Sequence, residues 1–270
     1  MRTQSTTVPG TPGRPNEDYA AVAVPAAGSG GALVLLDGVT ASFPDNGCSH
    51  EVSWYVARLG GALLELTGSR RDLSLTDCLA SAISRTADAH RGTCDLSHPR
   101  TPQSTVVCAR WDEAAVEYLV LSDSVLLLGE PEGAVRPVLD TRLDDLGPAA
   151  RRLPRESRGA FVESLRNAPG GFFTAAADPA VAELAVTGAV TRERVRALAA
   201  VTDGLGRWVE TFRLGGWPEL FAALLTRGPG PAIAEVRAAE ADDPDGAAFP
   251  RGKAHDDASA VVVELERSRL

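Results

Sequence analysis

The chain has 270 residues, of which 44% are hydrophobic and 23% are charged, and its formal net charge is −9. This composition is ordinary for a soluble globular protein and excludes a disordered chain, a collagen-like fibre and a disulfide scaffold. The acidic balance argues against nucleic acid or an anionic membrane as a partner. The apolar stretches stop well short of the roughly 20 residues of a membrane span.

The chain begins with a polar segment, residues 1–18, that is broken by three prolines. This segment lacks the apolar core of a secretory signal, so we expect a cytoplasmic protein. Within it, we expect residues 1–13 to be a flexible start.

Apolar spacing predicts the elements of the first half of the chain. Short strands are expected at 19–24 and 32–36, followed by amphipathic helices at 52–68 and 75–86. A run of strands with acid-rich turns follows at 104–110, 116–121, 125–128 and 135–139.

The second half mixes helices with fewer strands. We expect helical structure at 144–167, 179–184, 208–213, 219–227 and 233–241, and strands at 171–176, 196–202 and 259–265. No repeat, linker or low-complexity tract divides the chain. The order of elements indicates a single α+β domain over 1–270, with antiparallel sheets and helices outside them.

Four cysteines, Cys48, Cys78, Cys94 and Cys108, are scattered without a Cys-x-x-Cys pair. In a reducing compartment we expect them to be buried thiols. Cys94 and His98 could serve as metal ligands, but without a second such pair they are weak evidence for a structural zinc site.

Acidic residues stand where buried strands are expected to end or begin. They are Glu17, Asp18, Asp37, Asp123, Asp203, Asp256 and Asp257. The ends of neighbouring strands can meet at one rim of a sheet, where carboxylates repel each other unless cations neutralise them. Carboxylates suit Mg²⁺ or Mn²⁺, and Gly38 lets the backbone approach an ion closely. Any single Asp-Gly after a strand is also an ordinary turn signal.

The segments that carry these acids resemble, in order, the motifs of the protein phosphatase 2C family of metal-dependent phosphatases. They are Arg14-Pro15-Asn16-Glu17-Asp18, Leu36-Asp37-Gly38, Gln103-Ser104-Thr105, Ser122-Asp123-Ser124, Thr202-Asp203-Gly204 and His255-Asp256-Asp257-Ala258-Ser259. Each motif is short, but together they span nearly the whole chain.

The resemblance implies a four-layer α-β-β-α sandwich, with two central antiparallel sheets and two Mg²⁺ or Mn²⁺ ions in a cleft at one end. By motif, Asp37 would bridge both ions and the carbonyl of Gly38 would bind one of them. Asp203 and Asp256 would hold the first ion, and Glu17 would act on the second, chiefly through water.

The same resemblance assigns supporting roles. Asp123 matches the position associated with a third, weaker ion in bacterial members. Asp18, with Asp257, would support the ligands and orient their waters. Arg14 would clamp the substrate phosphate, and a variable flap-like region is expected at about 140–190.

Several positions depart from the family pattern. Arg14 lies one residue closer to the acidic pair than in many members, and Ser122 and Asp257 replace a glycine and an asparagine. Val39 stands where members often have a histidine that assists the leaving group. His50 could reach the cleft and donate a proton instead, although such a residue is more often a cap or a surface residue.

The implied activity is hydrolysis of phosphoserine and phosphothreonine on proteins, by a hydroxide that bridges the two ions. The expected partner is a phosphoprotein, such as the target of a bacterial Ser/Thr kinase, with no nucleic acid or membrane partner, and the expected state is a monomer. Two alternatives stay open: a phosphatase of a small phosphorylated metabolite, and a catalytically silent family member that acts by binding a partner.

Overall fold

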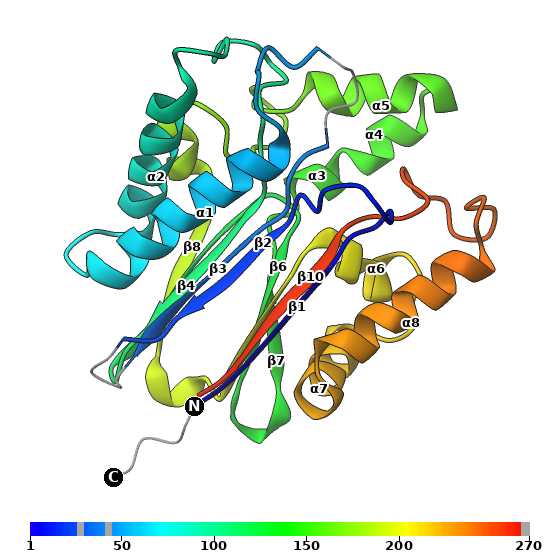
Figure 1. Cartoon of the computed structure of the whole chain (residues 1–270). Coiled ribbons are helices and arrows are strands. Elements are labelled where there is room, and N and C mark those ends of the chain that lie inside the picture. Colours follow the sequence, from blue (N-terminus) through cyan, green and yellow to red (C-terminus); the bar gives the residue numbers. More distant parts are fainter. Residues whose placement is uncertain (26–29, 41–44, 266–270) are drawn as a thin grey trace.

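Two antiparallel sheets lie face to face in the computed structural model, with helices on both outer faces (Figure 1). The structure describes residues 1–25, 30–40 and 45–265, and in these ranges each sheet has five strands. This is the four-layer α+β sandwich expected from the sequence. No helix in the same ranges is long and apolar enough to cross a membrane.

The strands of each sheet come from distant parts of the chain. One sheet has the order β2 (Tyr19–Ala23), β3 (Gly31–Leu36), β4 (Val106–Trp111), β5 (Ala115–Leu121), β8 (Val186–Thr191). The other has the order β1 (Arg2–Val8), β10 (Ala258–Glu264), β9 (Ala197–Val201), β6 (Val125–Gly129), β7 (Val135–Val138). Strands β3, β4, β6 and β9 are buried along their whole length, which explains why β3, β6 and β9 are continuous apolar runs and why β4 is apolar except for the buried Arg110.

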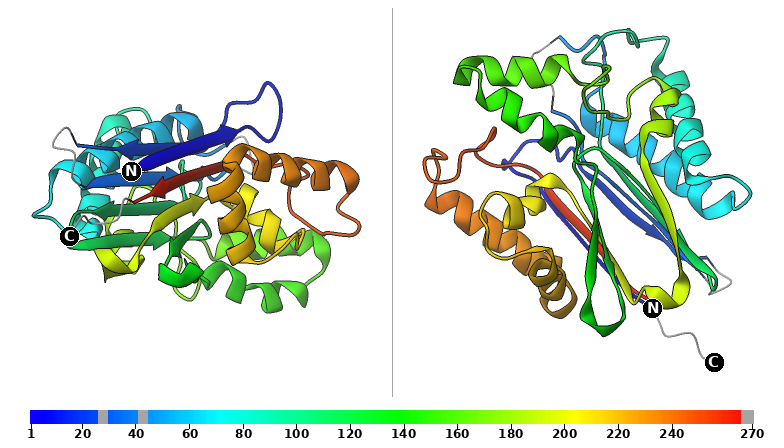
Figure 2. Two further views of the ribbon diagram at one scale, coloured as in Figure 1. Left: turned by 90° about the horizontal axis from the view of Figure 1, so that it is seen from below. Right: turned by 180° about the vertical axis from the view of Figure 1, so that it is seen from behind.

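Helices α1 (Val52–Ser69) and α2 (Leu75–His90) cover the first sheet, and their apolar faces form one core with it. Helices α6 (Asp203–Glu210), α7 (Trp217–Arg227) and α8 (Pro229–Asp242) cover the second. A further core fills the space between the sheets. The views in Figure 2 show the two helical layers on opposite sides of the sandwich.

The start of α2 shows how local sequence sets these elements. The Ser74 hydroxyl accepts a hydrogen bond from the backbone N–H of Asp77, and the Asp77 carboxylate accepts one from the backbone N–H of Ser74. This reciprocal capping box satisfies two amide groups that the first helical turn leaves unpaired.

A helical insert joins β7 to β8 and lies beyond one end of the sheets (Figure 1). It contains α3 (Arg142–Asp145), α4 (Gly147–Arg151), α5 (Arg155–Ser164) and η2 (Pro179–Leu184). Short 3-10 turns also occur at η1 (Pro131–Gly133) and η3 (Arg192–Arg194). The insert occupies the region where the sequence placed its flap, although β8 already begins at Val186.

Some expectations from the sequence were wrong. Residues 1–13 are not simply a flexible start, because β1 pairs with β10 along its whole length as a polar edge strand. Helix α6 begins at Asp203 rather than at 208. The strand expected at 171–176 is absent from the described chain, where that segment forms only isolated bridges.

The cysteines divide into two kinds. Cys78 and Cys108 are free and buried, which confirms the prediction of buried thiols for these two. Cys48 and Cys94 instead form a disulfide, so the prediction was wrong for them. No sequence pattern indicates this pair, because it depends on the meeting of two loops, one before α1 and one after α2.

Candidate active site

The predicted acidic residues gather at one end of the sandwich because strands of both sheets end or begin there. β3 ends one residue before Asp37, and β5 and β9 end two residues before Asp123 and Asp203. β10 begins two residues after Asp256 and runs antiparallel to β9, so these two ends lie side by side. The strand geometry therefore brings together carboxylates that are far apart in the sequence.

Two neighbouring cavities occupy this end. One, the acidic cavity, has a volume of about 310 Å³ and includes in its lining Asp37, Gly38, Asp123, Asp203 and Asp256. The other, the Arg14 cavity, has a volume of about 750 Å³ and includes in its lining Arg14, Glu17, Asp256 and Asp257. Thr40, Lys253 and Asp256 line both cavities, so they form the boundary between them.

Burial and mutual repulsion make Asp37, Asp123 and Asp18 hard to ionise. Burial, followed by the charges of Asp203, Asp18 and other acids, raises the pKa of Asp37 well above its ordinary value. Burial and the charge of Asp203 raise the pKa of Asp123 to about 6. Burial also raises the pKa of Asp18 to about 8, with contributions from neighbouring acids. Such a cluster becomes favourable as carboxylates only when cations neutralise it.

The residues fit a hard divalent cation. Asp18 Oδ1 and Asp203 Oδ1 are buried, and neither has a hydrogen-bond partner within the described residues. Unpaired buried oxygens are costly, and a bound cation with its waters would satisfy them. The donors in the acidic cavity are oxygens, which suit Mg²⁺ or Mn²⁺ better than a soft metal.

Gly38 lies where a side chain has no room. A Cβ at this position would come within 2.5 Å of the backbone oxygen of Glu17 and of Cγ1 of Val52. Thr105 holds the preceding residue, since its N–H donates to the Asp37 carbonyl (2.9 Å) and its hydroxyl accepts from the Asp37 N–H (3.2 Å). The backbone beside Asp37 is thus fixed and can approach an ion closely.

Asp257 ties the first motif to the last. Its Oδ1 accepts a hydrogen bond from the N–H of Gly10 and its Oδ2 accepts one from the N–H of Glu17, each at 2.7 Å. Asp18 lies deeper and accepts a hydrogen bond from the Thr202 hydroxyl at 3.1 Å. Both side chains therefore hold the loops that present the acidic residues.

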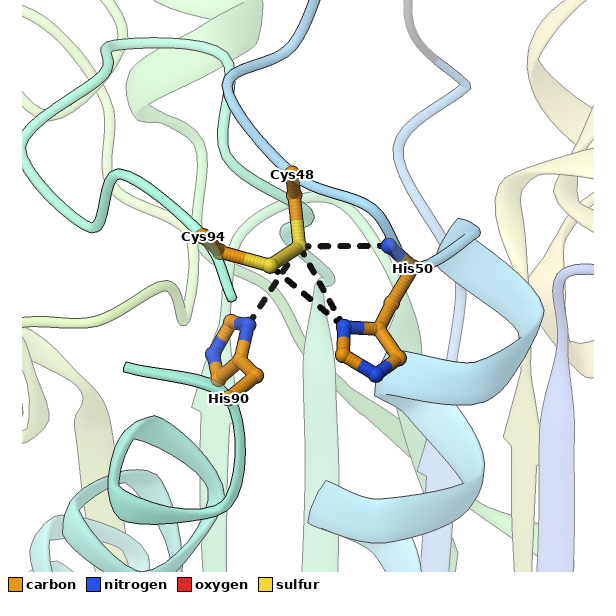
Figure 3. A group of neighbouring side chains, drawn as sticks. All are labelled: Cys48, His50, His90 and Cys94. Atoms are coloured by element: carbon orange, nitrogen blue, oxygen red, sulfur yellow. Dashed lines mark hydrogen bonds between the residues drawn. A yellow bond between two sulfur atoms is a disulfide. The ribbon is translucent and has the colours of Figure 1, made fainter. Parts of the chain in front are cut away.

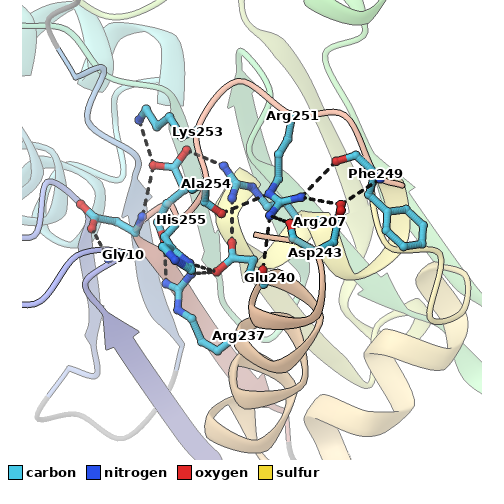
Figure 4. A network of polar contacts seen from close by, with 12 residues as sticks. Gly10, Arg207, Arg237, Glu240, Asp243, Phe249, Arg251, Lys253, Ala254 and His255 are labelled. Atoms are coloured by element: carbon cyan, nitrogen blue, oxygen red, sulfur yellow. Dashed lines mark hydrogen bonds and ion pairs between the residues drawn. The ribbon is translucent and has the colours of Figure 1, made fainter. Parts of the chain in front are cut away.

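Two cations in the site were missed by the sequence analysis. Lys253 Nζ lies 2.9 Å from Asp256 Oδ1, and an Arg207 guanidinium nitrogen lies 3.0 Å from Asp256 Oδ2. Arg207 also pairs with the fully buried Glu240, which Arg237 contacts as well (Figure 4). The only sequence signal was that Lys253 is the single lysine of the chain.

The helical insert supplies a further guanidinium. Arg166 lines the acidic cavity together with Val162 and Phe172. One nitrogen of Arg166 donates to Glu163 at 2.9 Å, whereas its Nε is buried without a hydrogen-bond partner in the described chain. No motif singled out this residue, because its place depends on the path of the insert.

Arg14 and His50 both lie outside the lining of the acidic cavity. Arg14 is exposed and lines the Arg14 cavity but not the acidic cavity, and within the described ranges no acidic side chain pairs with it. His50 lines neither cavity and stacks on Trp54, with ring centroids 3.9 Å apart. The structure therefore gives no support to the less favoured alternative, in which His50 donates a proton in the cleft.

Comparison with known proteins gives a match in structure alone. No family model matches the chain, and no curated protein matches it in sequence. Similar solved structures include the serine/threonine phosphatase Stp1 from Staphylococcus aureus, with a TM-score of 0.62 and 14% identity over 98% of this chain and 95% of that one.

Two further solved structures have a similar fold. The serine/threonine phosphatase PstP/Ppp of Mycobacterium tuberculosis has a TM-score of 0.60 and 15% identity over 98% of this chain and 99% of that one. A serine-threonine phosphatase 2C from Toxoplasma gondii has a TM-score of 0.60 and 13% identity, covering 98% and 94%. The chain has the fold of these phosphatases over nearly its whole length.

Proposed function

We propose that the chain is a metal-dependent phosphatase that hydrolyses phosphoserine and phosphothreonine on proteins. The observation that carries the proposal is the acidic cavity, where Asp37, Asp123, Asp203 and Asp256 meet at the same end of the sandwich. The fold supports it, because solved structures with this fold include serine/threonine phosphatases.

The proposed reaction divides the work between the carboxylates and the basic side chains. Two Mg²⁺ or Mn²⁺ ions would lower the pKa of a bound water toward neutrality and so supply the hydroxide that attacks phosphorus. Asp37, Asp203 and Asp256 would hold the ions, with Glu17 acting from the Arg14 cavity. Asp123 would hold a third, weaker ion.

The cavity walls supply positive charge for the phosphate. Burial lowers the pKa of Lys253, but attraction to Asp256 and neighbouring acids outweighs it, so the net pKa is raised and the ammonium stays charged. Lys253 and Arg166 line the acidic cavity, and Arg14 lines the neighbouring one. These groups would stabilise charge on the phosphoryl oxygens. Val39 has no proton to give, so water would protonate the departing oxygen.

A catalytically silent protein that binds a phosphorylated partner is the second candidate. Both oxygens of Asp256 are already paired, with Lys253 and Arg207, and a cation must compete with these groups. These hydrogen-bonded ion pairs are partly exposed to the cavities. A divalent ion carries a higher charge than Lys253 or Arg207, so it should displace these side chains from Asp256.

Phosphate release from phosphoserine peptides, with phosphorylated sugars and amino acids in parallel, tests the proposal. We expect Mn²⁺- or Mg²⁺-dependent turnover of the peptides that is abolished by EDTA and by Asp203→Asn. Preferential turnover of the small molecules would move the assignment to a metabolite phosphatase. Phosphopeptide binding without turnover would establish the silent protein.

A further inference from the structure

A second group of ligand-type side chains lies away from the acidic residues. It consists of Cys48, His50, His90 and Cys94, and Figure 3 shows the two imidazole rings facing the two sulfur atoms. One ligand atom from each residue lies within 4.8 Å of every other. We call these four residues the Cys2His2 cluster.

The cluster joins two loops through two short-spaced pairs. Cys48 and His50 precede α1, whereas His90 ends α2 and Cys94 follows four residues later. Two short-spaced pairs of ligands separated by a long stretch of chain are typical of structural zinc sites, and the three residues between His90 and Cys94 are within the usual spacing. The sequence pattern paired Cys94 with His98, but His98 is not part of the cluster.

Three sulfur–nitrogen distances in the cluster match edges of a zinc tetrahedron, whereas the two sulfur atoms are bonded to each other and must separate before a metal binds. Cys48 Sγ lies 3.4 Å from His90 Nδ1 and 3.7 Å from His50 Nδ1, and Cys94 Sγ lies 3.4 Å from His50 Nδ1. Zinc bonds of about 2.3 Å to sulfur and about 2.0–2.1 Å to nitrogen place sulfur and nitrogen about 3.6 Å apart in a tetrahedron. Both histidines therefore already stand at ligand distance.

We propose that the reduced chain binds one Zn²⁺ through these four side chains. The structure holds Cys48 and Cys94 as a disulfide, and a disulfide accounts for the two sulfurs alone. The disulfide alone does not explain why two imidazole nitrogens also point at these sulfur atoms. Two thiolates and two imidazoles are the donor set of a closed structural zinc site, and the thiolates exclude Mg²⁺ as the preferred ion.

The surroundings prepare the ligands for a metal. His90 is only 2% exposed, and its buried ring lies with Nδ1 3.4 Å from Cys48 Sγ. The backbone N–H of His50 donates to Cys48 Sγ at 3.4 Å, and such a contact stabilises a thiolate. Stacking of His50 on Trp54 fixes the ring.

The two loops are already held together by the backbone. The N–H of Asp95 donates to the carbonyl of Gly47 at 2.7 Å, directly beside the cluster. The lining of the Arg14 cavity includes Asn46, Glu51 and Val52. These residues belong to the loop that carries Cys48 and His50 and to the start of α1, which follows it. Zinc in the Cys2His2 cluster would therefore anchor one wall of that cavity.

Formation of the site from the disulfide is a balanced exchange. A dithiol reductant gives two electrons and two protons to the disulfide, leaving two cysteine thiols and an oxidised dithiol. Zn²⁺ then replaces the two thiol protons, which are released to solvent, and the histidines bind as neutral rings. The metal supplies no electrons.

Cobalt binding by the full-length, reduced and metal-free chain tests the proposal. Co²⁺ in the cluster should give visible bands of a tetrahedral site and a thiolate charge-transfer band, and one equivalent of Zn²⁺ should abolish both. Carboxylate sites give no thiolate band, so the acidic cavity does not interfere.

Variants separate a zinc site from a simple disulfide. His50→Ala, at a partly exposed position, leaves both cysteines able to oxidise and should weaken Zn²⁺ binding by at least about 100-fold. Cys94→Ser should remove the charge-transfer band, whereas His98→Ala and Cys78→Ala are controls that should retain it. Absence of the band in the reduced chain, or a Zn²⁺ affinity unchanged by His50→Ala, would overturn the proposal in favour of a disulfide alone.

Discussion

The ammonium of Lys253 lies 2.9 Å from Asp256 Oδ1, so the single lysine of the chain neutralises a predicted metal ligand. The same Nζ donates to the Thr40 hydroxyl at 3.0 Å, and that hydroxyl donates to Glu17 Oε2. A positive charge thus occupies the boundary between the acidic cavity and the Arg14 cavity.

Removing this charge should tighten metal binding. In Lys253→Met, Mn²⁺ no longer competes with an ammonium for Asp256, and we expect its affinity to rise about 5- to 30-fold, as for a change of about 1–2 kcal/mol. Calorimetric titration of Mn²⁺ measures this change, and Lys253→Arg is the control that keeps the charge. Equal affinities in Lys253→Met and the parent would show that Lys253 does not compete.

The metal-free protein should lose stability as the pH rises. Asp18 has a pKa of about 8 in the folded chain against an ordinary value of 3.8, so the folded state binds more protons between these values. The contribution of Asp18 to stability is therefore greatest below about pH 4, and it falls as the pH rises toward about 8.

Denaturant unfolding in EDTA measures this slope. Asp18→Asn should make the metal-free protein more stable at about pH 8, by on the order of 1–3 kcal/mol, and should flatten the pH dependence. Asp245→Asn, at an exposed position, is the control and should leave the slope unchanged. A metal-free protein that becomes more stable between about pH 5 and about pH 8, and loses stability in Asp18→Asn, would contradict this account.

Asp257→Ala should loosen the loop that carries Glu17. The substitution removes acceptors from the N–H groups of Gly10 and Glu17, and we expect a loss of about 2–4 kcal/mol in the free energy of unfolding. Asp257→Asn keeps one acceptor and should cost less. Urea denaturation checks both, and an Asp257→Ala variant as stable as the parent would mean that these bonds contribute little.

Gly38→Ala tests the close approach of the backbone beside Asp37. The new methyl group would overlap the Glu17 carbonyl and Val52, so we expect a loss of about 1–3 kcal/mol in stability. Gly61→Ala is the matched control, because in the described part of the chain an added Cβ at that helical glycine meets nothing within 4 Å beyond its chain neighbours and its own helix backbone. It should gain about 0.5–1 kcal/mol. Thermal unfolding measures the stability of both variants. A Gly38→Ala variant as stable as the parent would contradict the close approach of the backbone beside Asp37.

The sequence was informative where burial dictates pattern. Strands such as β3 and β9 are buried on both faces, so their apolar runs identified both the strands and the acids that follow them. The edge strand β1 was missed because it is polar, with alternating exposed residues and no apolar face. Its place depends on backbone pairing with β10, which side-chain pattern does not encode.

The site was predictable to the same extent. Asp37 and Asp203 come one and two residues after the ends of β3 and β9, so the apolar pattern indicated that they lie at the end of the sandwich where these strands finish. Arg207 and Arg166 lie on α6 and after α5, and their contacts depend on how helices cross the strand ends. The pairing of Cys48 with Cys94 likewise depends on how two loops meet, because the two cysteines are 46 residues apart in the sequence.

The most direct test of the central claim is the Mn²⁺ dependence of p-nitrophenyl phosphate hydrolysis by the parent chain and Asp37→Asn. We predict turnover that EDTA abolishes and added Mn²⁺ restores, and that Asp37→Asn lowers by at least about 1,000-fold while the protein stays folded. Turnover that survives both EDTA and Asp37→Asn would contradict a metal-dependent phosphatase built on the acidic cavity.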